Sequence, residues 1–331
     1  MSQGARRSVS ENVVGGLGVD KELVVIALGG NAILQPGQRG TAAEQFENVR
    51  QTCRQIVSLL ADGYRVVLTH GNGPQVGNIL IQNGATEAVP AMPMDICGAE
   101  SQGMIGYMMQ QTMGNELLRR GMRMPVASVV TQTIVSVEDQ AFRKPTKPVG
   151  PFYDEGYARK KIEAGETWIE DAGRGWRKVV PSPDPKEIVE LESVRALARD
   201  STLVICTGGG GIPVVREADG TLRGVEAVID KDLGGQRLAT GLEADVFMIL
   251  TDVSAAAINY GKPDQKWLGK LTVQEARALQ KEGHFKSGSM GPKVEACCRF
   301  VEAGGKRAVI ASLTQALDAL AGKAGTQIVP A

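Results

Sequence analysis

Short, almost continuous apolar runs that alternate with helical patterns constrain the fold of this 331-residue chain more than any other feature. The run at 22–28 (ELVVIAL) is followed by apolar residues at helical spacing over about 42–61, and the run at 65–68 (RVVL) comes next. Strands that are buried on both faces are apolar throughout. The pattern therefore predicts an α/β fold, an open αβα sandwich with a mainly parallel central sheet.

The same alternation continues to the end of the chain. Further helical patterns span about 99–119, 186–199, 233–242, 272–282 and 292–303, and further strand-like runs lie at 126–130, 202–206, 246–250 and 308–310.

One stretch interrupts this rhythm. Residues 133–185 are rich in Pro, Gly, Lys and aromatic residues, and a structureless loop of that length is rare in a compact domain. We expect a small protruding subdomain there. The Asp219-Gly220 pair lies between two alternating runs and predicts a hairpin within 211–228.

Composition narrows the classes of function. Lys+Arg and Asp+Glu both number 37, so the chain lacks the basic excess of nucleic-acid and membrane-surface proteins, and its partner is expected to be a small molecule. The five scattered cysteines and two histidines predict no disulfide framework and no metal cluster of side chains. Reduced thiols and the lack of an apolar run of about 20 residues predict a cytoplasmic protein. Residues 1–20, rich in Gly and Ser, are expected to be a disordered extension.

Four glycine-bearing turns follow predicted strands. They are Gly29-Gly30-Asn31, His70–Pro74, Thr207–Gly211 and Gly288–Lys293. Glycine lets the backbone approach a phosphate closely, and unpaired N–H groups at a helix start attract anions. In open α/β sheets such turns gather at the carboxyl ends of the strands, so the sequence predicts a phosphate site there.

None of these turns is a standard nucleotide fingerprint. The P-loop pattern is absent, and the spacing from Gly71 and Gly73 to Gly77 is one residue too long for a dinucleotide fold, which disfavours a dehydrogenase. The stretch Ala99–Gly103 comes close to a serine-hydrolase elbow around Ser101, but no convincing strand precedes it and His284 is the only late histidine.

Three lysines lie where cations would assist phosphoryl transfer. Lys147 lies between two prolines, Lys231 lies between Asp230 and Asp232, and Lys293 directly follows the last glycine turn. Fixed ammonium groups stabilise the charge of a transferring phosphoryl group, and a neighbouring aspartate can orient them.

Seven segments together resemble the carbamate kinase branch of the amino acid kinase family. They run in family order and are ALGGNAI (27–33), HGNGPQVG (70–77), AESQGMIGY (99–107), KPTKPVGPFY (144–153), TGGGGIPV (207–214), AVIDKD (227–232) and GSMGPK (288–293).

The resemblance implies an N-terminal carbamate-binding lobe (21–220), which includes the subdomain of about 133–185, and a C-terminal nucleotide-binding lobe (221–331). It implies that Lys147, Lys231, Asp232 and Lys293 are the catalytic residues. The carbamate and the transferring phosphoryl group would be held by Gly29, Gly30, Asn31, Gly71, Asn72, Gly73, Gly209 and Gly210. The nucleotide would be bound by Asp230, Lys231, Thr251, Asp252, Val253, Tyr260, Met290, Gly291 and Lys293.

The activity implied is reversible transfer, ATP + carbamate giving ADP + carbamoyl phosphate, used to make ATP in arginine catabolism. Mg²⁺ would be held mainly by the nucleotide phosphates, and the family suggests a homodimer. Two alternatives stay open from the residues: another phosphotransferase of the same family, forming an acyl phosphate or acting on a nucleoside monophosphate, and a non-catalytic nucleotide-binding regulator.

Overall fold

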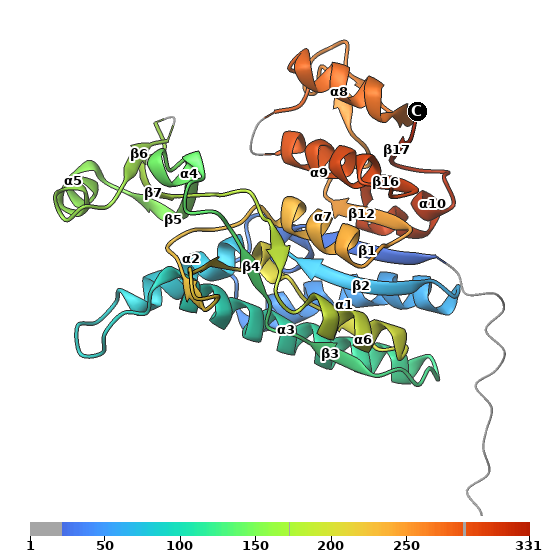
Figure 1. Cartoon of the computed structure of the whole chain (residues 1–331), viewed down its shortest axis with the longest axis horizontal. Helices are drawn as coiled ribbons and strands as arrows, with labels where there is room; N and C mark the ends of the chain where they lie inside the picture. Colours follow the sequence, from blue (N-terminus) through green and yellow to red (C-terminus); the bar gives the residue numbers. More distant parts are fainter. Residues whose placement is uncertain (1–21, 172, 287–288) are drawn as a thin grey trace, which may run out of the picture.

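A computed structural model of the chain describes residues 22–171, 173–286 and 289–331. An eight-stranded sheet forms its centre, in the order β15-β17-β16-β12-β1-β2-β9-β3, and every neighbouring pair except β16–β17 is parallel (Figure 1). In sequence order its strands are β1 Leu23–Leu28, β2 Arg65–His70, β3 Val126–Ser128, β9 Leu203–Ile205, β12 Val246–Thr251, β15 Lys270–Thr272, β16 Arg307–Ser312 and β17 Thr326–Val329.

Helices cover both faces of this sheet. The helices of the described chain are α1 Ala42–Ala61, α2 Gly73–Asn83, α3 Met94–Arg119, α4 Gln140–Arg143, α5 Glu155–Glu163, α6 Leu191–Arg199, α7 Lys231–Gly241, α8 Val273–Lys281, α9 Met290–Glu302 and α10 Ala316–Leu320. Three short 3-10 turns are η1 Gly30–Ala32, η2 Gly208–Gly210 and η3 Leu313–Gln315. The predicted α/β class with a mainly parallel sheet is confirmed.

Alternation along the central strands explains the two layers. On β1, Val24, Ile26 and Leu28 pack in one core with α1, α3 and α10, whereas Val25 and Ala27 face the other core with α6, α7, α8 and α9. Successive strand side chains point to opposite faces, so a strand between two helical layers must be apolar at every position. This is why the run at 22–28 shows no polar alternation.

Smaller sheets flank the central one. A four-stranded sheet has the order β11-β10-β4-β8 and contains β4 Gln132–Ile134, β8 Glu187–Ile188, β10 Ile212–Arg216 and β11 Leu222–Gly224. The antiparallel pair β10–β11 is the hairpin predicted around Asp219-Gly220. A two-stranded sheet pairs β13 Ala257–Ile258 with β14 Lys266–Trp267.

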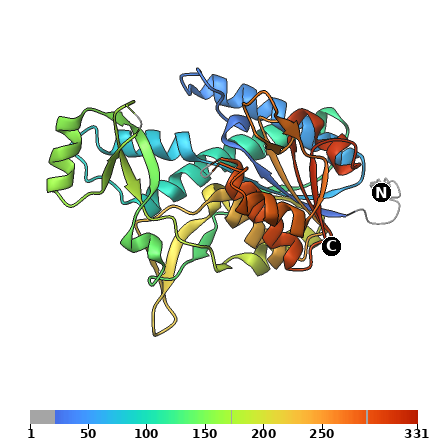
Figure 2. The ribbon, with the colours of Figure 1, turned by 90° about the horizontal axis from the view of Figure 1, so that it is seen from above.

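The aromatic insertion builds a sheet of its own. β5 Lys147–Tyr153, β6 Trp168–Glu170 and β7 Trp176–Val180 pair antiparallel in the order β5-β7-β6. With α5 they form a unit that stands away from the central sheet (Figures 1 and 2), and we call residues 147–180 the aromatic lobe. Tyr153, Tyr157 and Trp168 pack against one another at its centre, with ring centroids 4.4–5.8 Å apart.

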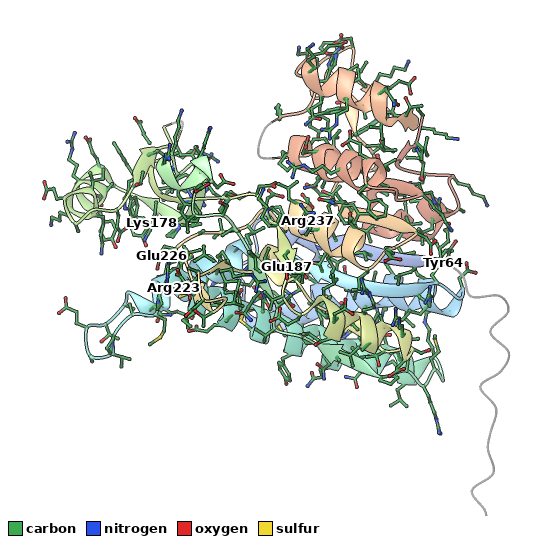
Figure 3. The ribbon with its side chains drawn as sticks, in the orientation of Figure 1. Tyr64, Lys178, Glu187, Arg223, Glu226 and Arg237 are labelled. Carbon is green, nitrogen blue, oxygen red and sulfur yellow. The ribbon has the colours of Figure 1, made fainter. Side chains whose placement is uncertain are left out.

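One predicted helix is wrong at its start. The pattern at 186–199 suggested a single helix, but Glu187–Ile188 is strand β8, which pairs with Thr133 and Ile134, and α6 begins only at Leu191. Pairing with a distant strand outweighs the local helical spacing. Figure 3 labels Glu187 on β8 and Arg237 on α7, and Arg237 donates from Nε to the carbonyl of Pro185 at 3.3 Å, which attaches this segment to α7.

Two further observations concern earlier expectations. The expected disordered extension, residues 1–20, lies outside the described residues, as does Gly288 of the last glycine turn. Among the described helices, none is both long enough and apolar enough to cross a membrane.

Candidate active site

Four loops gather at the carboxyl end of the central sheet. Strand β1 ends in Gly29 and η1, β2 in the Gly71–Gly73 turn, β9 in the Thr207–Gly211 turn, and β12 in Thr251. These strands are parallel neighbours, so their ends meet at one edge of the sheet, where ligands of open α/β folds bind.

The Thr207–Gly211 turn is built for close approach. Gly209 has φ +67°, and a Cβ atom there would lie 2.3 Å from Nδ2 of Asn72. A Cβ on Gly211, at φ +95°, would lie 2.0 Å from Oγ1 of Thr133. Only glycine satisfies both the left-handed backbone and the space available. The turn therefore exposes backbone next to the Asn72 side chain.

Asn72 is itself held by a helix on the other side. Its Nδ2 donates to Oγ of Ser101 at 2.8 Å, and that hydroxyl donates to the carbonyl of Gly98 at 2.6 Å. Ser101 lies inside α3 with no strand before it and is completely buried. A serine-hydrolase elbow is therefore excluded, and Ser101 acts here as a support for Asn72.

The His70 ring packs against the Thr207–Gly211 turn. Its ring is buried, Nδ1 lies 3.0 Å from the carbonyl oxygen of Gly71, and a Cβ on Gly208 would lie 2.5 Å from Cε1 and Nε2. Burial lowers the pKa of His70 to about 4, although its contact with Gly71 acts in the opposite direction. The ring is neutral near pH 7 and fills the space beneath two glycine turns.

Two aspartates organise the three lysines at the start of α7. Oδ1 of Asp232 lies 2.6 Å from Nζ of Lys231, and Oδ2 lies 3.1 Å from Nζ of Lys293. Asp230, the N-cap of α7, pairs with Nζ of Lys147 at 3.0 Å. The structure thus brings together three lysines that are far apart in the sequence.

The charge state of Asp232 follows from these contacts. Burial alone would raise the pKa of this carboxyl, but the ammonium groups of Lys231 and Lys293 outweigh burial and hold the pKa below its usual value. Asp232 is therefore an anion that fixes two ammonium groups at a single point.

Two cavities open beside this cluster. The first, of about 430 Å³, is lined by Thr251, Asp252, Val253, Ala257, Asn259, Tyr260, Lys262, Glu282, Gly283, His284, Lys286, Ser289, Met290 and Lys293. The second, of about 320 Å³, is lined by residues of the glycine turns, the lysine cluster and the aromatic lobe, including Gly30, Gly71, Asn72, Gly73, Lys147, Arg177, Gly209, Asp230, Lys231, Asp232 and Lys293. Ser289 and Lys293 line both cavities. We call them the large cavity and the cationic cavity.

Most residues singled out from sequence lie in one of these cavities. Thr251, Asp252, Val253, Tyr260 and Met290 line the large cavity, whereas Asp230, expected beside the nucleotide, lines the cationic one. Gly29, Asn31 and Gly210 lie in the surrounding turns, Gly291 lies at the start of α9, and none of these four residues lines either cavity.

Sequence reasoning missed several lining residues. Arg177 of β7 enters the cationic cavity, and Asn259, Lys262, His284 and Lys286 enter the large one. Arg177 lies in a basic stretch (Arg174 to Lys178) of the insertion, which has no glycine turn or apolar pattern to distinguish one cation from another.

The donor set limits how a metal ion could be held. Within the described ranges no three His, Cys, Asp or Glu side chains are grouped as metal ligands. The two carboxylates of the cationic cavity are both engaged by lysines. In the cationic cavity a metal ion would therefore compete with lysine ammonium groups for these carboxylates.

Comparisons with known proteins identify the family of this chain. Residues 22–312 match the model of the amino acid kinase family. The chain is 62% identical to the carbamate kinase of Thermococcus kodakarensis over 311 residues (92% of this chain, 98% of the relative) and 57% identical to that of Pyrococcus furiosus over 312 residues (93% and 99%). A solved carbamate kinase from Giardia lamblia, bound to AMP-PNP, superposes with a TM-score of 0.90 at 51% identity and covers 94% of this chain and 99% of its own. The chain therefore belongs to the amino acid kinase family, and within it to the carbamate kinases.

Proposed function

We propose that this chain catalyses reversible phosphoryl transfer, ATP + carbamate giving ADP + carbamoyl phosphate. The observation that carries the proposal is Lys293, which lines both the large and the cationic cavity while its Nζ is fixed on Asp232. A phosphoryl group that passes between molecules in the two cavities would have to cross at this ammonium group. We assign carbamate as the acceptor because the relatives are carbamate kinases.

In this proposal the nucleotide occupies the large cavity. Thr251, Asp252, Val253, Tyr260 and Met290 would border the base and ribose, and the boundary between nucleotide lobe and acceptor lobe would fall near residues 220–221. Among the described residues, those that line the large cavity all lie between 251 and 293, which supports assigning the nucleotide to the C-terminal lobe.

Carbamate would bind in the cationic cavity. The turn residues that line this cavity, Gly30, Gly71, Asn72, Gly73 and Gly209, would surround it together with the transferring phosphoryl group, and Gly29, Asn31 and Gly210 would hold these turns in shape from behind. Lys147, Lys231 and Lys293 would stabilise the charge that develops on the phosphoryl oxygens, with Asp230 and Asp232 holding them in position. Carbamate is already an anion, so direct in-line transfer needs positioning and charge rather than a general base.

We further propose that Mg²⁺ enters with the nucleotide. Its contribution when bound is to neutralise part of the charge of the phosphates. Removing Mg²⁺ with excess EDTA should abolish turnover, and turnover that persists after chelation would contradict this assignment.

We also propose a cytoplasmic homodimer that makes ATP from carbamoyl phosphate during arginine catabolism. Four exposed apolar side chains of α3 lie on one stripe of the helix, Ile96, Met104, Tyr107 and Leu118, and an exposed apolar stripe favours association. Sedimentation should give about twice the 35.1 kDa mass of the chain, and a monomer would exclude the dimer. Cell fractionation tests the cytoplasmic location. The ATP yield of cells that grow on arginine tests the role in arginine catabolism.

The activity is tested in the direction of ATP formation. Purified protein is mixed with Mg²⁺, ADP and fresh carbamoyl phosphate, and ATP is followed by luciferase. A protein-free sample corrects for spontaneous decay, and Lys231→Ala corrects for contaminating kinases. Fast ATP formation that depends on Lys231 is expected. No ATP above the control, with ADP still binding, would refute the carbamate assignment.

A further inference from the structure

Arg177 reaches the cationic cavity from the aromatic lobe rather than from the central sheet. It lies on β7, its side chain is 24% exposed, and its guanidinium carbon lies 5.2 Å from the centre of the Phe152 ring. Nε and Nη2 both donate to the carbonyl of Gly150, at 3.2 and 2.8 Å. Two bonds to one carbonyl and a ring contact hold the guanidinium in a defined orientation beside the cavity.

Its charge is balanced differently from the other cations of this cavity. Lys147, Lys231 and Lys293 each contact a carboxylate at 3.1 Å or less. The hydrogen bonds of Arg177 go to an uncharged carbonyl instead, and its one ion pair within the described ranges, Nη1 to Asp171, is long at 3.9 Å. Both N–H groups of Nη1 therefore lack a hydrogen-bond partner there.

The cavity as a whole has an excess of positive charge. Four cations (Lys147, Arg177, Lys231 and Lys293) and two carboxylates (Asp230 and Asp232) line it, which leaves an excess of two. Partial desolvation, with a contribution from the like charge of Arg174, lowers the pKa of Arg177 against the attraction of Asp171. An arginine remains charged at neutral pH even so. The ligand that best neutralises such a cavity is a dianion.

We propose that Arg177 binds the phosphate group of the phosphorylated acceptor through Nη1 and makes the cavity favour this dianion over the singly charged acceptor. The inference rests on the proposed function and adds a residue to its acceptor site. Nη1 carries two N–H donors for phosphate oxygens, and hydrogen bonds from a charged donor to an anion are stronger than those between neutral groups.

A purely structural role would also keep Arg177 in place. Gly150 has φ +72° and lies at an irregularity in the pairing of β5 with β7, and the two bonds from Arg177 stabilise that bend. The two roles make different predictions. A residue that only holds the bend would change stability and turnover without discriminating between substrates.

The chain provides a matched control in Arg174. Its guanidinium carbon lies 5.0 Å from the centre of the same Phe152 ring, and its Nη2 pairs with the same Asp171 at 2.8 Å. Its side chain is 63% exposed, however, and it lines neither cavity. Removing Arg174 therefore takes away a similar ring contact and an equal charge without touching the proposed site.

The experiment compares Arg177→Ala, Arg177→Lys and Arg174→Ala with the wild type. Loss of one charge-assisted contact should raise the KM for carbamoyl phosphate by about 10- to 100-fold in Arg177→Ala, with the KM for ADP changed by less than about twofold. Arg177→Lys should recover part of the loss, since it keeps the charge but not the bonds to Gly150 that orient the guanidinium. Arg174→Ala should match the wild type.

A binding measurement separates this inference from the proposed function. Inorganic phosphate should raise the melting temperature of the wild type and of Arg174→Ala, and should raise it much less in Arg177→Ala. An active wild type with equal KM values and equal phosphate shifts in all variants would overturn the role of Arg177 alone. Equal losses for both substrates, with a lower melting temperature, would assign Arg177 to the bend. An inactive wild type with an Arg177-dependent phosphate shift would instead overturn the proposed function and leave an anion site.

Discussion

At the scale of single residues, burial decides the chemistry of the groups behind the site. His70 and Asp232 are both buried, yet one is kept neutral and the other charged. At His70 no carboxylate of the described chain offsets burial, so burial lowers the pKa and the ring stays neutral. At Asp232 two ammonium groups offset burial, so the carboxyl stays charged. The same physical cost therefore produces a neutral support in one case and a fixed anion in the other.

The lowered pKa of His70 makes stability depend on pH. Between about pH 6.5 and 4 the unfolded state binds a proton at this residue and the folded state does not. The free energy of unfolding should therefore fall as the pH is lowered through this window, by about 1.4 kcal/mol per pH unit from this group. Urea unfolding of the wild type, His70→Gln and His284→Gln at several pH values measures the slope. The slope should decrease only in His70→Gln, and an unchanged slope there would contradict the assignment.

At the scale of elements, the helix α7, which carries Lys231 and Asp232, is packed directly on a glycine turn. A Cβ on Gly234 of α7 would lie 2.7 Å from both the Cα and the carbonyl oxygen of Gly210. Backbone cannot move aside as a side chain does, so the distance from α7 to η2 depends on this glycine. Lys231 and Asp232, one turn earlier, take their position from the same contact.

Gly234→Ala should therefore destabilise the protein by about 1–3 kcal/mol, as overpacking does, and lower turnover by displacing the start of α7. The control is Gly114→Ala in α3, where a Cβ meets no atom within 4 Å. That substitution should be neutral or stabilise by up to about 1 kcal/mol, because alanine favours a helix over glycine. Thermal unfolding and ATP formation measure both effects. Similar losses in the two variants would show that helix propensity, rather than contact with η2, is responsible.

At the scale of the whole molecule, the site is made by three parts that approach one another at the end of the sheet. The β12 and α9 regions supply the large cavity, the β1 and β2 turns supply one wall of the cationic cavity, and the aromatic lobe supplies Lys147 and Arg177. An ionic contact from Arg299 of α9 to Asp184 anchors the segment by which the chain returns from this lobe. The lobe is thereby tied to the same helix that carries Lys293.

Because Lys293 lines both cavities, it should matter for transfer more than for either binding step. Lys293→Ala should lower kcat by about 100-fold or more, as expected for loss of one preorganised donor. The KM for ADP should change much less. Steady-state kinetics with ADP and carbamoyl phosphate measure both constants, and Lys262→Ala, which changes a lysine of the large cavity alone, serves as control. Unchanged turnover in Lys293→Ala would remove this residue from the mechanism.

Sequence alone predicted the fold class, the hairpin near Asp219 and the helix at 42–61, whose bounds are those of α1. These features depend on local signals: apolar periodicity, turn residues and the length of buried runs. The turns at Gly29–Asn31, Gly71–Gly73 and Thr207–Gly211 were found for the same reason, since each directly follows a strand.

Only the tertiary structure decided which side chains share a cavity. The first residues of one predicted helix form strand β8 because they pair with β4, and the sequence did not show this pairing since β4 lies more than 50 residues earlier in the chain. Asp230, predicted beside the nucleotide, lines the cationic cavity and pairs there with Lys147, and Arg177 reaches the same cavity through the pairing of β7 with β5. Each of these outcomes depends on contacts between residues far apart in the chain, whereas the periodicity of a sequence reports only on near neighbours.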